Sequence, residues 1–568
     1  MPAIFSRAGA LASMVLALSS CALFAPPPLD PVIGDTGQAL SANALAFDVQ
    51  AYELDLEVFP DAKTIKGSSS TTVVALRDID HIELKLDSRF NISGAFVDRQ
   101  KTPATFSRNG GIVTIHLRKG LKAGNSARIT LDYDGKPHIA LRAPWAGGIV
   151  WSKTDSGKDW IATAVQGEGC DLWWPCKDHF ADKPERLRLQ ITVPDNLSVA
   201  MNGHLVAIDD LGQGRRRFDW QMNVPASDYN ISLNIGPFVR IQESYQSVNG
   251  TTVPIEFWAL PEHEQKARDL INNDLRGQIE FFEKMLGPYP WGDEKMGFVE
   301  TPHLGMEHQT INAYGKGYER DSNGYDWLLQ HELSHEWFGN LMTHKTLNHA
   351  WLHEGFGEYM QPAYARYRFG DAAYKSSMYS NYLRQQNCKE IVLDGNPTAE
   401  QAFNGDIYFK GAWTLHTLRW LVGDDVFWKA TRELLYGTAD TAALTYPITP
   451  RYRTTEDFIA LINQYSGRDY NWLFNVYLRE VDLPELITTR ENDQLRLQWQ
   501  VANNKPFPMP VPVTINGKAQ MLDMTNGRAT LDVKSTDHLL IDPDMQVFRY
   551  LPIIGKCKEN EERANKRR

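Results

Sequence analysis

Hydrophobic and polar residues alternate through much of the first half of the chain. In the segments 52–58 and 187–193, every second residue is a large apolar one, and the residues between them are charged or polar. A period of two residues is typical of a strand with one buried and one solvated face. Gly, Asn, Asp and Pro separate such runs, as expected of turns between strands. The pattern predicts an N-terminal all-β domain over residues 45–250.

The spacing of apolar residues then changes. Over residues 264–286 they recur every three or four positions, which is typical of an amphipathic helix, and a Gly-Pro pair follows as a stop signal. Helical spacing dominates the region 251–485, which is predicted to form a mainly helical domain. Alternation returns over 486–552 and predicts a small C-terminal β domain. The tail 553–568 is rich in charged residues and is predicted to be disordered.

The N-terminus has the pattern of an export signal. A single basic residue precedes an apolar stretch that is too short to span a membrane, and Leu18-Ser19-Ser20-Cys21 resembles a bacterial lipobox. This predicts a signal peptide over 1–20, lipidation of Cys21 and a flexible tether over 21–44. The resemblance implies an exported, lipid-tethered protein, placed at the outer membrane and facing the periplasm. The alternative is an ordinary signal peptide that is cut shortly after Cys21 without lipidation.

Composition narrows the classes of function. The chain of 568 residues is 42% hydrophobic and 23% charged, which is typical of soluble globular domains. Its formal net charge of −11 argues against nucleic acid as a partner, because phosphate binding needs a positive surface. After the N-terminal signal, no uncharged apolar run approaches the ~18 residues of a spanning helix. Cys170 and Cys176 are close enough in sequence to pair in an exported protein, and buried free thiols are the equal alternative.

The segment 327–338 carries the strongest chemical signal. It has the pattern of a helix in which His331 and His335 are four positions apart and so project from one face. Two imidazoles placed in this way can bind one Zn²⁺, and Glu332 stands where a carboxylate can take a proton from a metal-bound water. Three further histidines show no ligand spacing and are expected on the surface: His344, His349 and His353.

A third ligand indicates a catalytic rather than a structural site. Glu354 lies in a second helical run, 351–359, and two histidines with one carboxylate leave the fourth position of a tetrahedral zinc ion open. One zinc ion is therefore the expected cofactor. Glu358, one turn later, is a candidate to accept the second N–H of His331, because metal-bound histidines usually donate this group to a carboxylate or a carbonyl. The alternative for Glu358 is a solvated helix carboxylate.

With these motifs, the sequence resembles the zinc aminopeptidases of the aminopeptidase N and leukotriene-hydrolase type over residues 45–550. The segment Gly305-Met306-Glu307-His308 is similar to the family's GxMEN motif, with histidine in place of the usual asparagine. The resemblance implies that Glu307 binds the free α-amine of a peptide substrate. Gly305 and Met306 are implied to be part of the same substrate site.

Two more segments carry the resemblance. Tyr408-Phe409-Lys410-Gly411 is similar to the family's YxKG segment, which implies that the Tyr408 hydroxyl stabilises the oxyanion of the reaction. Gln166-Gly167-Glu168 is similar to a β-domain segment that gives a second contact to the substrate amine. By position Glu168 matches this role best, and Gln166 is the second candidate.

The resemblance also implies a fold and a reaction. The expected fold is multidomain α+β, with an N-terminal saddle-like β domain, a thermolysin-like, mainly helical zinc domain and a small C-terminal β-sandwich. The large C-terminal helical domain of many relatives is not expected, which predicts an open cleft that accepts longer peptides. The expected activity is hydrolysis of the first peptide bond of peptides with a free N-terminus. The alternatives are a thermolysin-like endopeptidase, an epoxide hydrolase and a non-catalytic peptide-binding scaffold.

Overall fold

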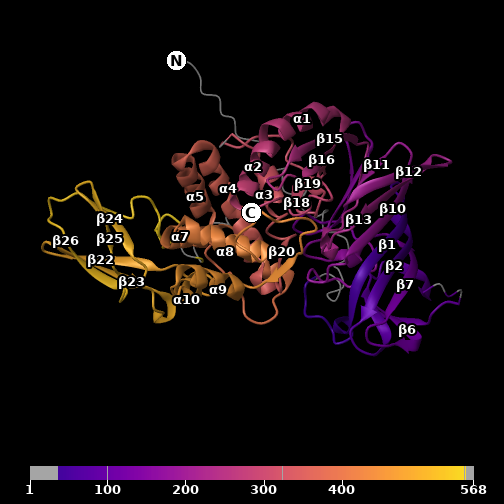
Figure 1. The fold of residues 1–568 in the computed structure, drawn as a ribbon, viewed down its shortest axis with the longest axis horizontal. Coiled ribbons are helices and arrows are strands. Elements are labelled where there is room, and N and C mark those ends of the chain that lie inside the picture. Colours follow the sequence, from indigo (N-terminus) through magenta and orange to yellow (C-terminus); the bar gives the residue numbers. More distant parts are fainter. Residues whose placement is uncertain (1–35, 99, 101, 323, 555–556, 558–568) are drawn as a thin grey trace, which may run out of the picture.

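The computed structural model of the protein describes residues 36–98, 100, 102–322, 324–554 and 557. Figure 1 shows three parts in a row, with strands at one end, helices in the middle and the C-terminal strands at the other end. This arrangement confirms the predicted multidomain α+β class. The predicted signal peptide and the lipidation candidate Cys21 lie outside the described residues.

The N-terminal part is built on a seven-stranded sheet. Strand β1 lies in the middle of this sheet, where it pairs antiparallel with β2 on one side and parallel with β10 on the other. Leu54 of β1 therefore lies opposite both Ser69 and Leu189. The apolar residues of the alternating run 52–58 are buried, as their spacing predicts. In sheet order the strands are β12 (His204–Gly212), β13 (Arg215–Met222), β10 (Arg186–Pro194), β1 (Phe47–Phe59), β2 (Thr64–Ala75), β7 (Ser126–Gly135) and β4 (Phe90–Val97).

Two smaller sheets complete the N-terminal part. One is four-stranded, and its strand β9 is followed directly by the segment 165–168. The other is three-stranded. The first comprises β11 (Ser198–Ala200), β14 (Asn234–Gly236), β9 (Asp159–Ala164) and β8 (Gly148–Lys153), and the second β3 (Ile79–Lys85), β6 (Ile112–Leu121) and β5 (Phe106–Asn109). Just after β9, Cys170 and Cys176 form a disulfide with a Cα–Cα distance of 6.3 Å. Of the two predicted alternatives, the disulfide is therefore the one found in the structure, and Cys170 and Cys176 are not free thiols.

The segment 36–44 is packed against the folded chain. Thr36 is 3% exposed, and its Oγ1 donates a hydrogen bond of 2.8 Å to Asp178 Oδ1. Gln38 Nε2 donates to the carbonyl oxygen of Pro397, in the helical part, over 3.0 Å. The predicted flexible tether therefore needs correction for residues 36–44, because a composition rich in Pro and Gly does not show which tertiary neighbours a segment meets.

The junction between the first two parts lies earlier than predicted. β15 (Val239–Gln246) and β16 (Thr252–Ala259) form an antiparallel hairpin within a five-stranded sheet that continues with β17 (Met296–Glu300), β19 (Asn312–Tyr314) and β18 (Gly305–Met306). The predicted boundary at residue 250 divides this hairpin and is wrong. Alternation marks β15 as a strand, but it does not say which sheet the strand joins.

Helices form the middle part, as the spacing of apolar residues predicts. The predicted helix 264–286 consists of α1 (Glu264–Leu270), a π-helical turn (Ile271–Leu275) and α2 (Arg276–Met285). The other helices are α3 (Trp327–Ser334), α4 (Trp351–Phe369), α5 (Asp371–Arg384), α6 (Ala399–Ala402), α7 (Gly405–Val422), α8 (Asp424–Tyr436), α9 (Thr455–Ser466) and α10 (Asn471–Tyr477), with the short strands β20 (Met342–His344) and β21 (Arg451–Arg453) between them.

Two three-stranded sheets form the C-terminal part. One contains β22 (Glu485–Glu491), β23 (Gln494–Gln500) and β26 (Arg528–Asp532), and the other β25 (Lys518–Leu522), β24 (Val511–Ile515) and β27 (Leu539–Ile541). The predicted disordered tail needs one correction, since Cys557 forms a disulfide with Cys388, 169 positions earlier in the chain.

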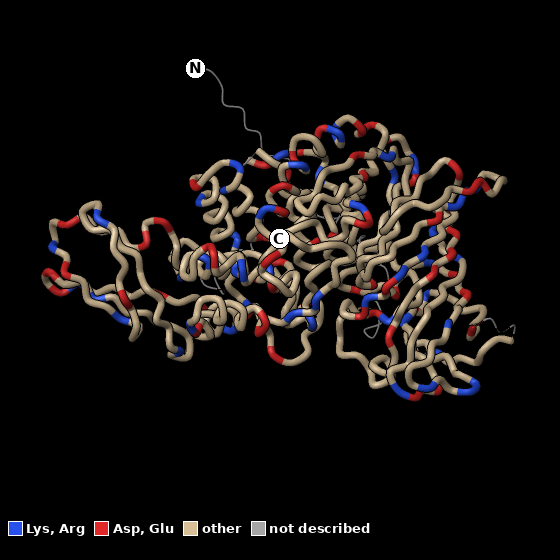
Figure 2. The backbone as a smooth tube through the Cα atoms, viewed as in Figure 1, with Lys and Arg blue, Asp and Glu red and all other residues tan. Residues whose placement is uncertain are grey.

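Exposed charges are distributed over all three parts. Figure 2 shows Lys and Arg interspersed with Asp and Glu along the described chain. Among the described helices, none combines the length and the apolar character that crossing a membrane requires. Isolated ion pairs between exposed charges contribute little to stability, so the main stabilising contribution is attributed to the buried apolar side chains.

Candidate active site

Helices α3 and α4 bring the three predicted metal ligands together. Asp326 caps α3 by accepting a hydrogen bond of 2.9 Å from the Leu329 N–H, and this cap fixes the start of the helix. His331 and His335 then lie one turn apart, with 3.2 Å between their Nε2 atoms. Glu354 Oε2, from α4, lies 3.7 Å from His331 Nε2 and 3.5 Å from His335 Nε2.

This geometry fits a tetrahedral zinc ion. Two nitrogen ligands about 2.1 Å from zinc lie about 3.4 Å apart in a tetrahedral site, close to the spacing of these atoms. The oxygen Oε2 of Glu354 is buried and has no hydrogen-bond partner among the described residues. Burial by itself would raise the pKa of Glu354, but His335 and His331 lower it to about 2, so the carboxylate is ionised as a ligand must be.

The outer nitrogens of the two imidazoles have different partners. His335 Nδ1 lies 2.9 Å from the carbonyl oxygen of Phe338, which can only accept, so the Nε2 lone pair faces the other ligands. His331 Nδ1 lies 3.3 Å from Nε2 of Gln361. The hypothesis that Glu358 contacts His331 therefore needs correction, because Gln361 occupies that place and Glu358 Oε2 accepts from the Gln361 amide over 2.9 Å.

Glu332 points its carboxylate into the same region. It is 6% exposed, and its Oε2 has no hydrogen-bond partner among the described residues. Strand β18 passes close by, since a Cβ atom added at Gly305 would lie 2.3 Å from Glu332 Oε1. Any larger residue at position 305 would displace the Glu332 carboxylate, which gives a physical reason for glycine here.

Glu307, directly after β18, is held by two side chains of the N-terminal β part. Gln166 Nε2 donates to Glu307 Oε1 over 2.6 Å, and the Tyr229 hydroxyl donates to the same atom over 2.9 Å. Asn340 Nδ2 donates to the backbone oxygen of Glu307 over 3.0 Å. Burial raises the pKa of the Glu307 carboxyl, while the nearby charge of His335 lowers this pKa and that of Glu354 raises it. Two donors on Oε1 leave Oε2 available to a ligand.

Glu168 has a different place from the one predicted. Its Oε1 accepts a hydrogen bond of 2.6 Å from the Gly147 N–H, at the start of β8, and its Oε2 is buried without a partner among the described residues. The chain around Gly167 directs Gln166 and not Glu168 toward Glu307, which makes Gln166 the better candidate for the amine contact.

Tyr408 stands in the first turn of α7. Asn404 caps this helix through a hydrogen bond of 3.0 Å from the Asp406 N–H. The Tyr408 ring lies 6.1 Å from that of His331, measured between centroids. Burial raises the pKa of its hydroxyl well above the usual value, and the carboxylates of Glu354 and Glu307 raise it further. The hydroxyl therefore stays protonated and can donate a hydrogen bond.

Two residues at the site have no motif that reveals them in the sequence: Tyr229 and Gln361. The predicted surface position is also wrong for two of the three histidines, since His344 is 2% exposed and His353 is fully buried. The Nε2 atom of His353 accepts a hydrogen bond of 3.0 Å from the His344 N–H. A single sequence does not distinguish such a histidine from a solvated one.

The buried carboxyl of Glu168 makes the stability of the protein depend on pH. Burial raises its pKa from 4.5 to about 7, against the lowering effect of the Gly147 N–H. The folded state thus binds the proton more tightly than the unfolded state, and stability falls as pH rises from about 4.5 to about 7. Glu168→Gln is expected to raise the free energy of unfolding by about 2 kcal/mol at pH 8 relative to wild type, and by little at pH 4.5. Urea unfolding at both values measures this, and an equal gain at both contradicts the assignment.

Comparisons with known proteins agree with this fold and site. Residues 49–230 match the Peptidase M1 N-terminal domain, and residues 278–465 match the Peptidase family M1 domain. Human aminopeptidase B is 26% identical over 438 residues, which cover 69% of this chain and 64% of that protein. Leukotriene A-4 hydrolase of Xenopus laevis is 24% identical over 67% of this chain and 64% of its own length. The chain thus matches less than two thirds of the length of each.

Solved structures show the same fold. The M1 zinc metallopeptidase of Deinococcus radiodurans superposes with a TM-score of 0.64 at 23% identity, covering 80% of this chain and 98% of that one. A mutant of that protein bound to a Tyr-Ser-Ala substrate matches with the same TM-score at 24% identity. The two family models match the β part and the helical part in order, and the three predicted metal ligands lie close together. The chain therefore belongs to the M1 peptidase family.

Proposed function

We propose that the protein is a zinc-dependent aminopeptidase. The observation that carries the proposal is the position of Glu307, a buried carboxylate fixed by Gln166 and Tyr229 beside the metal-ligand cluster. An anion at a fixed distance from the reacting centre binds a cationic α-amine and admits only the first peptide bond. Peptides with a free N-terminus are therefore the proposed substrates.

The other residues at the site have matching roles. His331, His335 and Glu354 would hold zinc, which when bound lowers the pKa of a water molecule and polarises a carbonyl group. Glu332, buried beside them with a free oxygen, is placed to take the proton of the attacking water and to return it to the leaving amine. Tyr408 offers a protonated hydroxyl to the developing oxyanion.

The first test uses aminoacyl-p-nitroanilides with matched N-acetylated controls on the purified protein. We expect cleavage of the free-amine substrates and none of the acetylated ones. Cleavage of acetylated substrates or of internal bonds would instead favour the thermolysin-like endopeptidase. Addition of a chelator should abolish activity, and added Zn²⁺ should restore it.

Two substitutions separate the roles of Gln166 and Glu168. Gln166→Ala removes a donor from Glu307, and we expect KM for free-amine substrates to rise about tenfold, since a hydrogen bond to a charged group contributes about 1.5–3 kcal/mol. Glu168→Gln should leave KM and kcat within about twofold. Steady-state kinetics on one substrate measure both variants. A larger rise in KM for Glu168→Gln than for Gln166→Ala would return the amine contact to Glu168.

We further propose that the protein is exported and tethered by a lipid at Cys21. The support is the lipobox-like segment 18–21 together with the two disulfides, which form in oxidising compartments. Labelling with palmitate and mass spectrometry of the mature N-terminus test this. Incorporation that is lost in Cys21→Ser supports the tether, and an unlipidated mature form contradicts it.

A further inference from the structure

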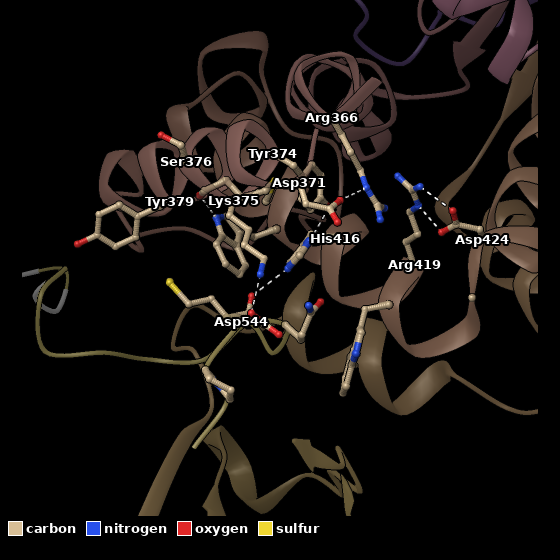
Figure 3. Close-up of a pocket in the computed structure, with 17 residues that line it drawn as sticks. Arg366, Asp371, Tyr374, Lys375, Ser376, Tyr379, His416, Arg419, Asp424 and Asp544 are labelled. Carbon is tan, nitrogen blue, oxygen red and sulfur yellow. Dashed lines mark hydrogen bonds and ion pairs between the residues drawn. The ribbon is translucent and has the colours of Figure 1, made fainter. Parts of the chain in front are cut away.

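A cavity of about 650 Å³ lies where helices of the middle part meet residues 543–546 of the C-terminal part (Figure 3). Its walls come from the end of α4, from α5 and α7, and from residues 543–546, which follow β27 in the C-terminal part. None of the residues that line it belongs to the metal cluster or to the amine site. A volume of this size is typical of sites for small molecules.

The charges on the cavity wall balance each other. Three basic and three acidic side chains line it, and they form the ion pairs Arg366–Asp371 at 2.6 Å, Lys375–Asp544 at 2.6 Å and Arg419–Asp424 at 2.8 Å. Figure 3 shows these pairs around His416. Burial lowers the pKa of His416 to about 4, with Arg419 and Arg366 adding to the effect, so this ring is neutral. The cavity is therefore strongly polar without a net charge.

One arginine keeps donors for a ligand. Arg366 donates to Asp371 through Nε, and its guanidinium lies over the Tyr374 ring, 5.6 Å from the ring centroid; its two Nη groups have no hydrogen-bond partner among the described residues. Arg419 differs, because its Nε and Nη2 bind Asp424 and its Nη1 donates to the Tyr359 hydroxyl. On the acidic side, Lys375 binds one oxygen of Asp544, a residue whose side chain is 55% exposed, which leaves the other oxygen to accept.

The rest of the wall is aromatic and firmly held. Trp413 and Trp420 contribute apolar surface to the lining. The hydroxyl of Tyr374 lies 2.6 Å from His416 Nδ1, and His416 Nε2 donates over 2.9 Å to the carbonyl oxygen of Met545. The first bond joins α5 to α7, and the second joins the helical part to the C-terminal part. A wall fixed in this way loses little conformational freedom when a ligand binds.

We infer that this cavity binds a small zwitterion, namely a free amino acid or a dipeptide with an apolar side chain. The carboxylate of the ligand meets the Nη groups of Arg366, its ammonium group meets Asp544, and its side chain packs on the tryptophans. A ligand with one net charge would leave one member of the balanced set without a counter-charge, whereas a zwitterion keeps the balance of the three ion pairs. The inference does not depend on the proposed peptidase activity.

Isothermal titration of L-phenylalanine into the full chain tests the site. Glu307→Gln serves as the parent, so that binding at the amine site is weakened and does not obscure the cavity. The matched probes are N-acetyl-L-phenylalanine, which is an anion, and L-phenylalaninamide, which is a cation. Arg366→Gln and Asp544→Asn alter the cavity, and Arg268→Gln, which breaks an exposed pair with Glu264 on α1, is the control.

We expect one binding site per chain in the parent and in the Arg268→Gln control. Loss of one ionic contact should weaken binding of L-phenylalanine about tenfold in Arg366→Gln and in Asp544→Asn. Both matched probes should also bind about tenfold more weakly than the zwitterion. No binding to the parent at millimolar concentration overturns the inference. So does equal binding of the acetylated probe, or unchanged affinity in both cavity variants.

Discussion

Glu332→Gln is expected to reduce kcat for free-amine substrates about 10²–10⁴-fold, while the protein keeps its zinc. Glutamine has the same shape as glutamate but cannot accept the proton of the attacking water. The side chain of Glu332 is 6% exposed and its Oε2 has no hydrogen-bond partner among the described residues, so this oxygen is free to accept the proton. The three ligand residues are untouched, which is why metal content should not change.

Two measurements decide this prediction. Steady-state kinetics give kcat, and elemental analysis of the dialysed protein gives the zinc content of each variant. Glu264→Gln, an exposed glutamate on α1 paired with Arg268, is the matched control and should behave as wild type. A Glu332→Gln protein with bound zinc and activity within tenfold of wild type would remove Glu332 from the reaction.

Tyr408→Phe should lower kcat about 10²–10³-fold and leave KM within about threefold. Phenylalanine keeps the ring near that of His331 and removes only the hydroxyl, whose pKa is raised by burial and by the nearby carboxylates. A donor aimed at charge that develops during the reaction contributes little to binding of the ground state. The effect should therefore appear in kcat rather than in KM.

The control for Tyr408 is Tyr452→Phe on β21, where the side chain is 40% exposed. We expect this variant to retain wild-type kinetics. An unchanged kcat in Tyr408→Phe, or a change confined to KM, would exclude the hydroxyl from oxyanion stabilisation and assign it to substrate binding.

Local sequence is sufficient for the part of the site that lies on one helix. Residues four positions apart on a helix are neighbours whatever the rest of the fold does, so the spacing of His331 and His335 already places two imidazoles on one face. The same applies to the helical middle part as a whole, because a period near 3.6 residues specifies the helix itself. Glu354 follows from its ligand type in a second helical run, and resemblance to a family adds Glu307.

Tertiary structure decides which side chains complete the site. Gln166 and Tyr229 lie 141 and 78 positions from Glu307, and they reach it only because the β part docks on the helical part. The choice of Gln361 over Glu358 as the neighbour of His331 depends on how α4 is rotated against α3. The sequence by itself thus determined the helix that carries the first ligands and the chemistry of the motif residues. The partners of those residues were decided by packing, because contacts between distant segments depend on the relative placement of whole elements and leave no periodic signal in one chain.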